Sequence, residues 1–197
     1  MRIIAGEFRS RVLRSFEGRG IRPMLDRVRQ SLFDVLGEGA SGASEVLDLY
    51  AGSGSLGLEA LSRGARRATF VERCASSLSV LRENVASLRL GPDRARVVAA
   101  EALAAAARFA GEGERFDLVF LDPPYALTRP GREAEGFAET LSTGLFERIA
   151  SDDATVVLHV ESGSDVPPIA GFGAPRVREM GDSRIAFYAR GGGRRPG

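Results

Sequence analysis

Residues 116–125 read Phe-Asp-Leu-Val-Phe-Leu-Asp-Pro-Pro-Tyr, an apolar run that ends abruptly in a carboxylate, two prolines and an aromatic ring. A continuous apolar run bounded by a breaker is typical of a central strand in a parallel sheet, buried on both faces. Because neither proline can donate a hydrogen bond to a neighbouring strand, the strand must stop at Asp122. The stretch therefore predicts an α/β sheet with a ligand site at the carboxyl edge of this strand.

The residues that follow this strand suit methylation of an exocyclic amine, a poor nucleophile because its lone pair is delocalised into a ring. The Asp122 carboxylate and the Pro123 carbonyl can each accept one N–H bond, so that the lone pair points at an electrophilic methyl group. Proline fixes the backbone angle that presents this carbonyl. Tyr125 can stack on the base. The alternative is a strand that ends in a turn, with Asp122 as a cap and Tyr125 on the surface.

A glycine-rich loop follows the first buried strand of the main domain. Gly52, Gly54 and Gly57 have the G-x-G-x-x-G spacing of nucleotide-binding loops, which alone is a weak signal. Asp48 precedes the loop, and Glu72 ends the next strand, where a carboxylate suits a ribose diol. A carboxylate at Asp48 repels a pyrophosphate and attracts an amino acid that carries a sulfonium. The loop therefore favours S-adenosylmethionine over NAD, and a structural turn without a ligand is the third interpretation.

The remaining pattern alternates strands with helices and predicts a mostly parallel sheet that ends in an antiparallel pair. The expected strands are Glu45–Tyr50, Ala68–Glu72, Ala95–Ala99, Thr155–Val160 and the pair Arg176–Met180 and Ser183–Ala189, which turns at Gly181-Asp182. The expected helices run from the glycine loop through Arg63, over Ala75–Leu90, over 102–109 and over Phe137–Ile149, with a polar loop at Ala126–Gly136.

Three further polar residues have alternative interpretations. Glu101 can accept from an adenine amino group, or it can simply favour the first turn of the helix at 102–109. His159, the one histidine, lies inside a predicted strand and is interpreted as structural. Cys74 is the one cysteine, which excludes a disulfide within the chain and gives no case for a nucleophile. One cysteine and one histidine also predict no metal site.

The N-terminal residues 1–36 are predicted to form a basic extension. They contain expected strands at Arg2–Ala5 and Arg11–Phe16 and a helix at Arg27–Leu36. Residues 1–30 hold eight arginines and three acidic residues, a net charge of +5 in a chain whose net charge is +1. This asymmetry indicates a polyanion-binding segment, although a solvated arm without a partner is the alternative. The candidate phosphate contacts are Arg2, Arg9, Arg11, Arg22 and Arg27.

A glycine- and serine-rich linker, Gly37–Ser44, separates this extension from the main domain at residues 45–190, and residues 191–197 (GGGRRPG) are expected to be a disordered basic tail. The chain has 197 residues, and its hydrophobic fraction of 44% suffices for a sizeable core. It contains no apolar run of membrane-spanning length, and its first residues lack the apolar core of a signal peptide. We expect a cytoplasmic monomer without a membrane partner.

Three stretches together resemble the class I S-adenosylmethionine-dependent methyltransferases. They are Val46–Gly54 (VLDLYAGSG), Gly57–Ala65 (GLEALSRGA) and Asp122–Tyr125 (DPPY). Arg2–Gly6 (RIIAG), Arg22-Pro23, Asp26–Arg29 (DRVR) and Leu32-Phe33 are similar, more narrowly, to the bacterial small-subunit ribosomal RNA guanine-N2 methyltransferases of the RsmD type. The similarity spans roughly residues 1–190 in the right order, which is more specific than any single motif.

The resemblance implies a Rossmann-like seven-stranded sheet and methylation of one guanine N2 of 16S ribosomal RNA during 30S assembly. The implied partner is small-subunit ribosomal RNA or a 30S assembly particle. By resemblance, Asp122, Pro123 and Tyr125 hold the target amine, and the cofactor contacts are Asp48, Ala51, Gly52, Ser53, Gly54, Glu72 and Glu101. Two positions depart from the family: Met24 replaces a usual threonine and loses a hydroxyl contact, and Glu101 stands where related enzymes vary.

Other functions fit parts of the same pattern. Adenine N6 of DNA or RNA, or a protein glutamine, also presents a planar amine to Asp-Pro-Pro-Tyr. We expect no dedicated DNA-recognition domain, since the 197 residues leave room only for the N-terminal extension. A non-catalytic RNA-binding assembly factor is a third possibility, but it has no use for the geometry of Asp122, Asp48 and the glycines.

Overall fold

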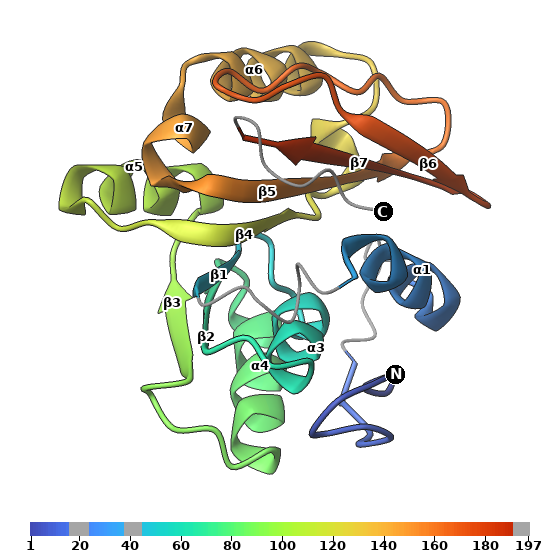
Figure 1. Cartoon of the computed structure of the whole chain (residues 1–197), viewed down its shortest axis with the longest axis vertical. Helices are drawn as coiled ribbons and strands as arrows, with labels where there is room; N and C mark the ends of the chain where they lie inside the picture. The colour runs from blue at the N-terminus through green and yellow to red at the C-terminus, as the bar shows by residue number, and fades with distance from the viewer. Residues whose placement is uncertain (16–23, 38–44, 191–197) are drawn as a thin grey trace.

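The computed structural model describes residues 1–15, 24–37 and 45–190. A seven-stranded sheet crosses the molecule in the order β3-β2-β1-β4-β5-β7-β6 (Figure 1). Its parallel part consists of β1 (Glu45–Asp48), β2 (Arg67–Glu72), β3 (Ala95–Ala99), β4 (Phe116–Leu121) and β5 (Ala150–Glu161). β7 (Ser183–Ala189) runs antiparallel to β5 and to β6 (Arg176–Met180). The predicted α/β fold, with a mostly parallel sheet and an antiparallel C-terminal pair, is confirmed.

Helices cover both faces of the sheet (Figure 1). One face packs against α1 (Asp26–Leu36), α3 (Ser55–Ser62) and α4 (Ala75–Ser87), together with the N-terminal residues. The opposite face packs against α5 (Ala102–Glu112), α6 (Arg132–Ser142) and α7 (Leu145–Ile149). Within the described ranges, the helices are all too short or too polar to cross a lipid bilayer.

β4 is the central strand that its sequence predicts. Its register pairs Leu118 with Val46 of β1 on one side and Leu121 with Leu158 of β5 on the other. From Leu118 to Leu121 each residue is buried. From β1 the chain continues to β2 and β3 on one side of the sheet, and from β4 it continues to β5 on the other side. The strand order therefore reverses between β1 and β4. In open α/β sheets a ligand binds at the carboxyl edge beside such a reversal.

Two sequence predictions for the segment that follows β4 in the chain are wrong. The polar loop expected at Ala126–Gly136 instead contains a 3₁₀ turn, Tyr125–Leu127, and the first half of α6. The single helix expected at Phe137–Ile149 is two helices, because Gly144 adopts φ 75° between α6 and α7. α6 buries only Phe137 and Leu141, so its exposed polar residues were misread as a loop, although a surface helix needs one apolar stripe.

The N-terminal hairpin is more compact than predicted. In place of two strands, residues 1–15 form one antiparallel bridge between Arg2 and Val12, and Phe16 lies outside the described residues. Ile3 donates its backbone N–H to the Arg11 carbonyl, and Leu13 donates to Met1. The tight turn between them uses Gly6 at φ 82° and Ser10 at φ 67°. Gly6 and Ser10 lie between the two predicted strands, so the predicted connection is correct and only the length of the flanking strands was overestimated.

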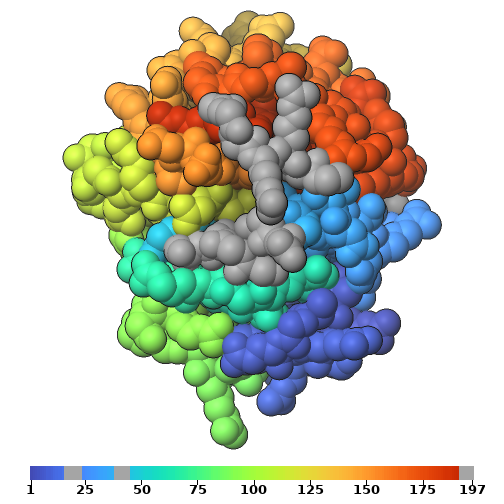
Figure 2. Space-filling view, viewed as in Figure 1, coloured from blue at the N-terminus to red at the C-terminus, as the bar shows by residue number. Residues whose placement is uncertain are grey.

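This extension is docked on the domain as part of its core. Ile3 and Leu13 are 1% and 2% exposed and belong to the core on the α3 side of the sheet. A Cβ atom on Gly6 would lie 1.8 Å from the carbonyl oxygen of Ser62, at the end of α3. Figure 2 shows the N-terminal residues pressed against α3 and α4. Most of the predicted linker, residues 38–44, lies outside the described residues, as does the tail 191–197.

Candidate active site

A cavity of about 600 Å³ opens at the carboxyl edge of the parallel strands. Its wall is built by the loops after β1, β2, β3 and β4, by the end of β5 and by the first half of α6. Ser15 and Met24 from the N-terminal extension also line it. Of the predicted site residues, the cavity wall includes Ala51, Gly52, Ser53, Glu72, Glu101, Asp122, Pro123 and Tyr125.

The three glycines of the loop have different surroundings. Gly52 has φ 54°, and a Cβ atom there would meet no atom within 4 Å, so its backbone borders open cavity space. A Cβ atom on Gly54 would lie 2.5 Å from Leu81 Cδ1, and one on Gly57 would lie 2.3 Å from Phe70 Cε1. Gly54 and Gly57 therefore allow α3 to pack closely, whereas Gly52 is the glycine that leaves room for a ligand.

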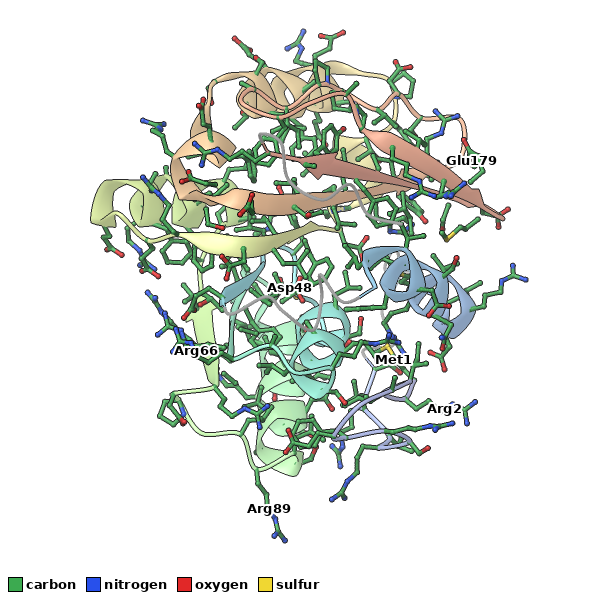
Figure 3. All side chains as sticks on the ribbon, viewed as in Figure 1. Met1, Arg2, Asp48, Arg66, Arg89 and Glu179 are labelled. Atoms are coloured by element: carbon green, nitrogen blue, oxygen red, sulfur yellow. The ribbon has the colours of Figure 1, made fainter. Side chains whose placement is uncertain are left out.

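Asp48 lies beneath the loop instead of on the cavity wall, deep inside the molecule (Figure 3). Its Oδ2 accepts the backbone N–H of Gly57 at 3.0 Å, while Oδ1 is buried without a hydrogen-bond partner among the described residues. Burial raises the pKa of Asp48 to about 7; the Gly57 N–H opposes this rise, and Asp122 and Glu72 add to it. Asp48 is therefore a weaker source of negative charge near neutral pH than the sequence argument assumed.

Glu72 and Glu101 organise the backbone around the cavity. Glu72 Oε2 accepts from Gly52 N at 2.9 Å, and Oε1 accepts from the backbone N–H groups of Arg73 and Cys74 at 2.8 and 2.7 Å. Glu101 caps α5 by accepting from Ala104 N at 2.8 Å. The helix-start interpretation of Glu101 is therefore correct, and its position on the cavity wall leaves the adenine contact as a prediction.

Among the described residues, those that line the cavity are mainly acidic where they are charged. Glu72, Glu101, Asp122 and Glu133 line it, and Arg73 is the one arginine among the lining residues. S-adenosylmethionine has a net positive charge because its ammonium and sulfonium outnumber its carboxylate. The acidic wall and the space beside Gly52 fit such a cation better than a pyrophosphate. In residues 1–15, 24–37 and 45–190, no group of three or more His, Cys, Asp or Glu residues could hold a metal ion.

Two hydrogen-bond acceptors stand where β4 ends. The Asp122 side chain is 30% exposed and lines the cavity. The carbonyls of Pro124 and Tyr125 accept N–H groups from the following turn at 2.9 and 2.8 Å. The Pro123 carbonyl, in contrast, accepts no hydrogen bond from the described residues. The Asp122 carboxylate and the Pro123 carbonyl thus have the capacity that the amine hypothesis requires.

Tyr125 is held from two sides. Its ring and that of His159 form a T-shaped pair with centroids 6.5 Å apart, and the Arg129 guanidinium lies 5.4 Å from the Tyr125 centroid. Arg129 is itself paired with Glu161 at the end of β5, through contacts of 2.6 and 2.8 Å. The Arg129 guanidinium lies over the Tyr125 ring, and the stacking of Tyr125 on a base stays a prediction.

The sequence interpretation of His159 as structural missed its contact with the predicted amine-binding residue. His159 Nδ1 lies 2.6 Å from Asp122 Oδ1, and the ring lines the cavity. The contact arises because β5 pairs with β4 and Leu158 lies beside Leu121. The available signal was a histidine in the strand that pairs with the Asp-Pro-Pro strand. This signal could be recognised only with knowledge of the strand order.

Comparison with known proteins places this chain in a family. The family model described as conserved hypothetical protein 95 matches residues 1–189. "Ribosomal RNA small subunit methyltransferase D" of Escherichia coli K12 is 35% identical over 191 residues, which cover 96% of this chain and 90% of the relative. The chain belongs to this family, the RsmD family.

A further relative and a solved structure agree with this assignment. The Haemophilus influenzae protein of the same name is 41% identical over 125 residues, which span 64% of this chain and 64% of the relative, less than two thirds of each. The solved structure of yhhF from Escherichia coli has a TM-score of 0.77 at 35% identity and covers 96% of this chain and 97% of that chain. The resemblance inferred from the sequence motifs is confirmed.

The arginines predicted to contact RNA lie in different settings in this RsmD-family chain. Arg9, Arg11 and Arg27 are exposed, and Arg22 lies outside the described residues. Arg2 points to solvent (Figure 3), with a 70% exposed side chain whose Nε is 3.9 Å from Asp26. The same N-terminal region also contains a fully buried arginine, Arg29, which contributes to its net charge but not to its surface.

Proposed function

We propose that this chain transfers a methyl group from S-adenosylmethionine to the exocyclic N2 of a guanine in 16S ribosomal RNA. The observation that carries the proposal is the pair of acceptors at the end of β4, the Asp122 carboxylate and the Pro123 carbonyl, beside a cavity suited to a cation. The names of its RsmD-family relatives support small-subunit ribosomal RNA as the substrate class.

The cofactor would occupy the cavity between the glycine loop and the ends of β2 and β3. Ala51, Gly52 and Ser53 would border its methionine part, Glu72 its ribose and Glu101 its adenine edge. Asp48 and Gly54 would act from beneath, by holding the start of α3 in place. When bound, the cofactor supplies a methyl group made electrophilic by the sulfonium.

The protein would contribute positioning of the acceptor amine. Asp122 and the Pro123 carbonyl would each accept one N–H of the amine, which turns the nitrogen lone pair toward the methyl group. Tyr125 would stack on the flipped base. Once methylated, the nitrogen is acidic and releases one proton, so Asp122 need not be a strong base.

A direct test is mass mapping of 16S ribosomal RNA from a strain that lacks this gene. We expect one guanine to lose an N2-methyl group, and the purified protein with S-adenosylmethionine to restore it on RNA or particles from that strain. Restoration on particles but not on naked RNA would identify an assembly intermediate as the substrate. A methyl group found on adenine N6, or on a protein glutamine, would contradict the proposal, as would unchanged RNA.

The exposed arginines of the N-terminal extension are proposed to contact RNA phosphates. Replacement of Arg9 and Arg11 together by alanine should weaken RNA binding, because both side chains are exposed and would lose their proposed phosphate contacts. Each lost phosphate contact flattens the log–log salt dependence by about 0.7–0.9, so the double variant should lose roughly one to two units. Binding titrations at several salt concentrations measure this slope.

A matched control removes the same charge from the other face of the sheet. Arg108 of α5 and Arg148 of α7 are also exposed, so their double alanine variant should keep the wild-type slope. Affinity for S-adenosylmethionine should stay unchanged in both variants. If the Arg9/Arg11 variant keeps the wild-type salt dependence, RNA must dock elsewhere.

A further inference from the structure

The end of β5 adds a further side chain, His159, to the predicted amine site. His159 is 4% exposed, and its Nδ1 lies 2.6 Å from Asp122 Oδ1. Its other nitrogen, Nε2, is buried and has no hydrogen-bond partner among residues 1–15, 24–37 and 45–190. Within these residues the carboxylate of Asp122 is therefore the one polar partner of the ring.

The short contact fixes where the imidazole proton must lie. A nitrogen and a carboxylate oxygen at this separation must share a proton, since two acceptors would repel each other. With the proton on Nε2, the Nδ1 lone pair would face Asp122 and a buried N–H would lack an acceptor. With the proton on Nδ1, the ring donates to the carboxylate, and only a lone pair is left unpaired.

We infer that His159 is a positioning residue for methyl transfer, which donates its Nδ1–H to Asp122 and thereby fixes the carboxylate as an acceptor for the target amine. The inference rests on the proposed amine methylation. A carboxylate turns easily about its last side-chain bond, because that torsion is broad. The bond to a buried ring holds one oxygen, so the other keeps a constant direction relative to the Pro123 carbonyl. Misplacement by about 1 Å can cost about 10²-fold in rate.

Two substitutions of His159 separate this role from packing. His159→Phe keeps an aromatic ring beside Tyr125 but removes the donor, so kcat should fall about 10–100-fold. KM for RNA, affinity for S-adenosylmethionine and the melting temperature should change little. His159→Asn places an amide N–H near the position of Nδ1 and should recover most of kcat. Equal losses in both variants, or a wild-type kcat in His159→Phe, would overturn the inference.

A double-mutant cycle tests whether His159 acts through Asp122. If it does, Asp122→Ala/His159→Phe should transfer methyl groups no more slowly than Asp122→Ala alone. If the rate of the double variant instead falls by the product of the two single losses, His159 acts independently of Asp122, which would contradict the inference.

Nitrogen NMR of histidine-labelled protein provides a readout that needs no substrate. The wild type should show the Nδ1–H tautomer, and Asp122→Ala should lose it. A neutral ring protonated on Nε2 in the wild type would overturn the inference even if methylation of the RNA is established. Conversely, an Nδ1–H tautomer in a protein that leaves 16S ribosomal RNA unmethylated would contradict the proposed substrate and retain the Asp122–His159 pair. If His159→Phe does not fold, the kcat of His159→Asn and the tautomer of the wild-type imidazole decide.

Discussion

The Asp122→Ala variant is expected to transfer methyl groups about 10²–10³-fold more slowly than the wild type, because removal of one positioning group in an active site commonly has this effect. The loss should appear in kcat, since the carboxylate aligns the amine for reaction. Affinity for S-adenosylmethionine should remain near the wild-type value. Single-turnover transfer of a labelled methyl group measures the rate, and calorimetric titration measures cofactor affinity.

Stability should change only modestly in this variant. Asp122 lies at the end of β4 with a side chain that is 30% exposed, so alanine leaves no large cavity. The change does leave the buried Nδ1 of His159 without a partner, at a cost of about 1–3 kcal/mol. Asp122→Asn is the matched control, because it keeps the shape and one acceptor oxygen. Its rate should lie between those of the wild type and Asp122→Ala. Near-wild-type turnover of Asp122→Ala would remove the amine-positioning role.

The sequence predicted those parts of the site that one strand and its following loop determine. β4 was recognisable because a parallel strand buried on both faces leaves a continuous apolar run, and the prolines mark its end. Glu72 and Glu101 were placed correctly near the cavity for the same reason, since each directly follows or ends a predicted strand.

The contacts that depend on strand pairing could not be predicted in this way. His159 reaches Asp122 only because β5, and not another strand, lies beside β4 in the observed register. A lone histidine in an apolar strand carries no local pattern that distinguishes this contact from ordinary burial. Asp48 shows the same limit, because its depth beneath the loop, which raises its pKa, follows from how α3 packs on the sheet.

The relation of the N-terminal extension to the domain was also hidden from sequence. The net charge of residues 1–30 suggested an extension separate from the main domain. A count of charged residues, however, does not distinguish a buried arginine from an exposed one. Arg29 donates to Asp26 Oδ1 at 3.0 Å and to the Arg2 carbonyl, and burial lowers its pKa, while Asp26 and Glu59 oppose that shift. Arg29 therefore joins the start of the chain to α1 within the extension, and its Nε lies 3.9 Å from Glu59 of α3.

Glu59 of α3 is the residue through which this attachment can be broken. Its side chain is fully buried and accepts the backbone N–H groups of Ile4 and Ala5 at 2.8 and 3.1 Å. It also accepts from Arg63 Nε at 2.7 Å and lies 3.9 Å from Arg29 Nε. Glu59→Ala should destabilise the protein by about 3–5 kcal/mol, because it leaves the buried Arg29 and two backbone donors without this partner. Urea unfolding measures the change in the free energy of unfolding.

An exposed pair that joins the same two parts of the chain is the matched control. Arg14 of the extension and Glu83 of α4 are 2.6 Å apart, with side chains 75% and 46% exposed. Glu83→Ala should therefore cost only about 0–1 kcal/mol. In Glu59→Ala the amides of Ile4 and Ala5 should also exchange with deuterium faster than in Glu83→Ala, since they lose their acceptor. Equal destabilisation by the two substitutions would contradict the assignment of the attachment to the buried carboxylate of Glu59.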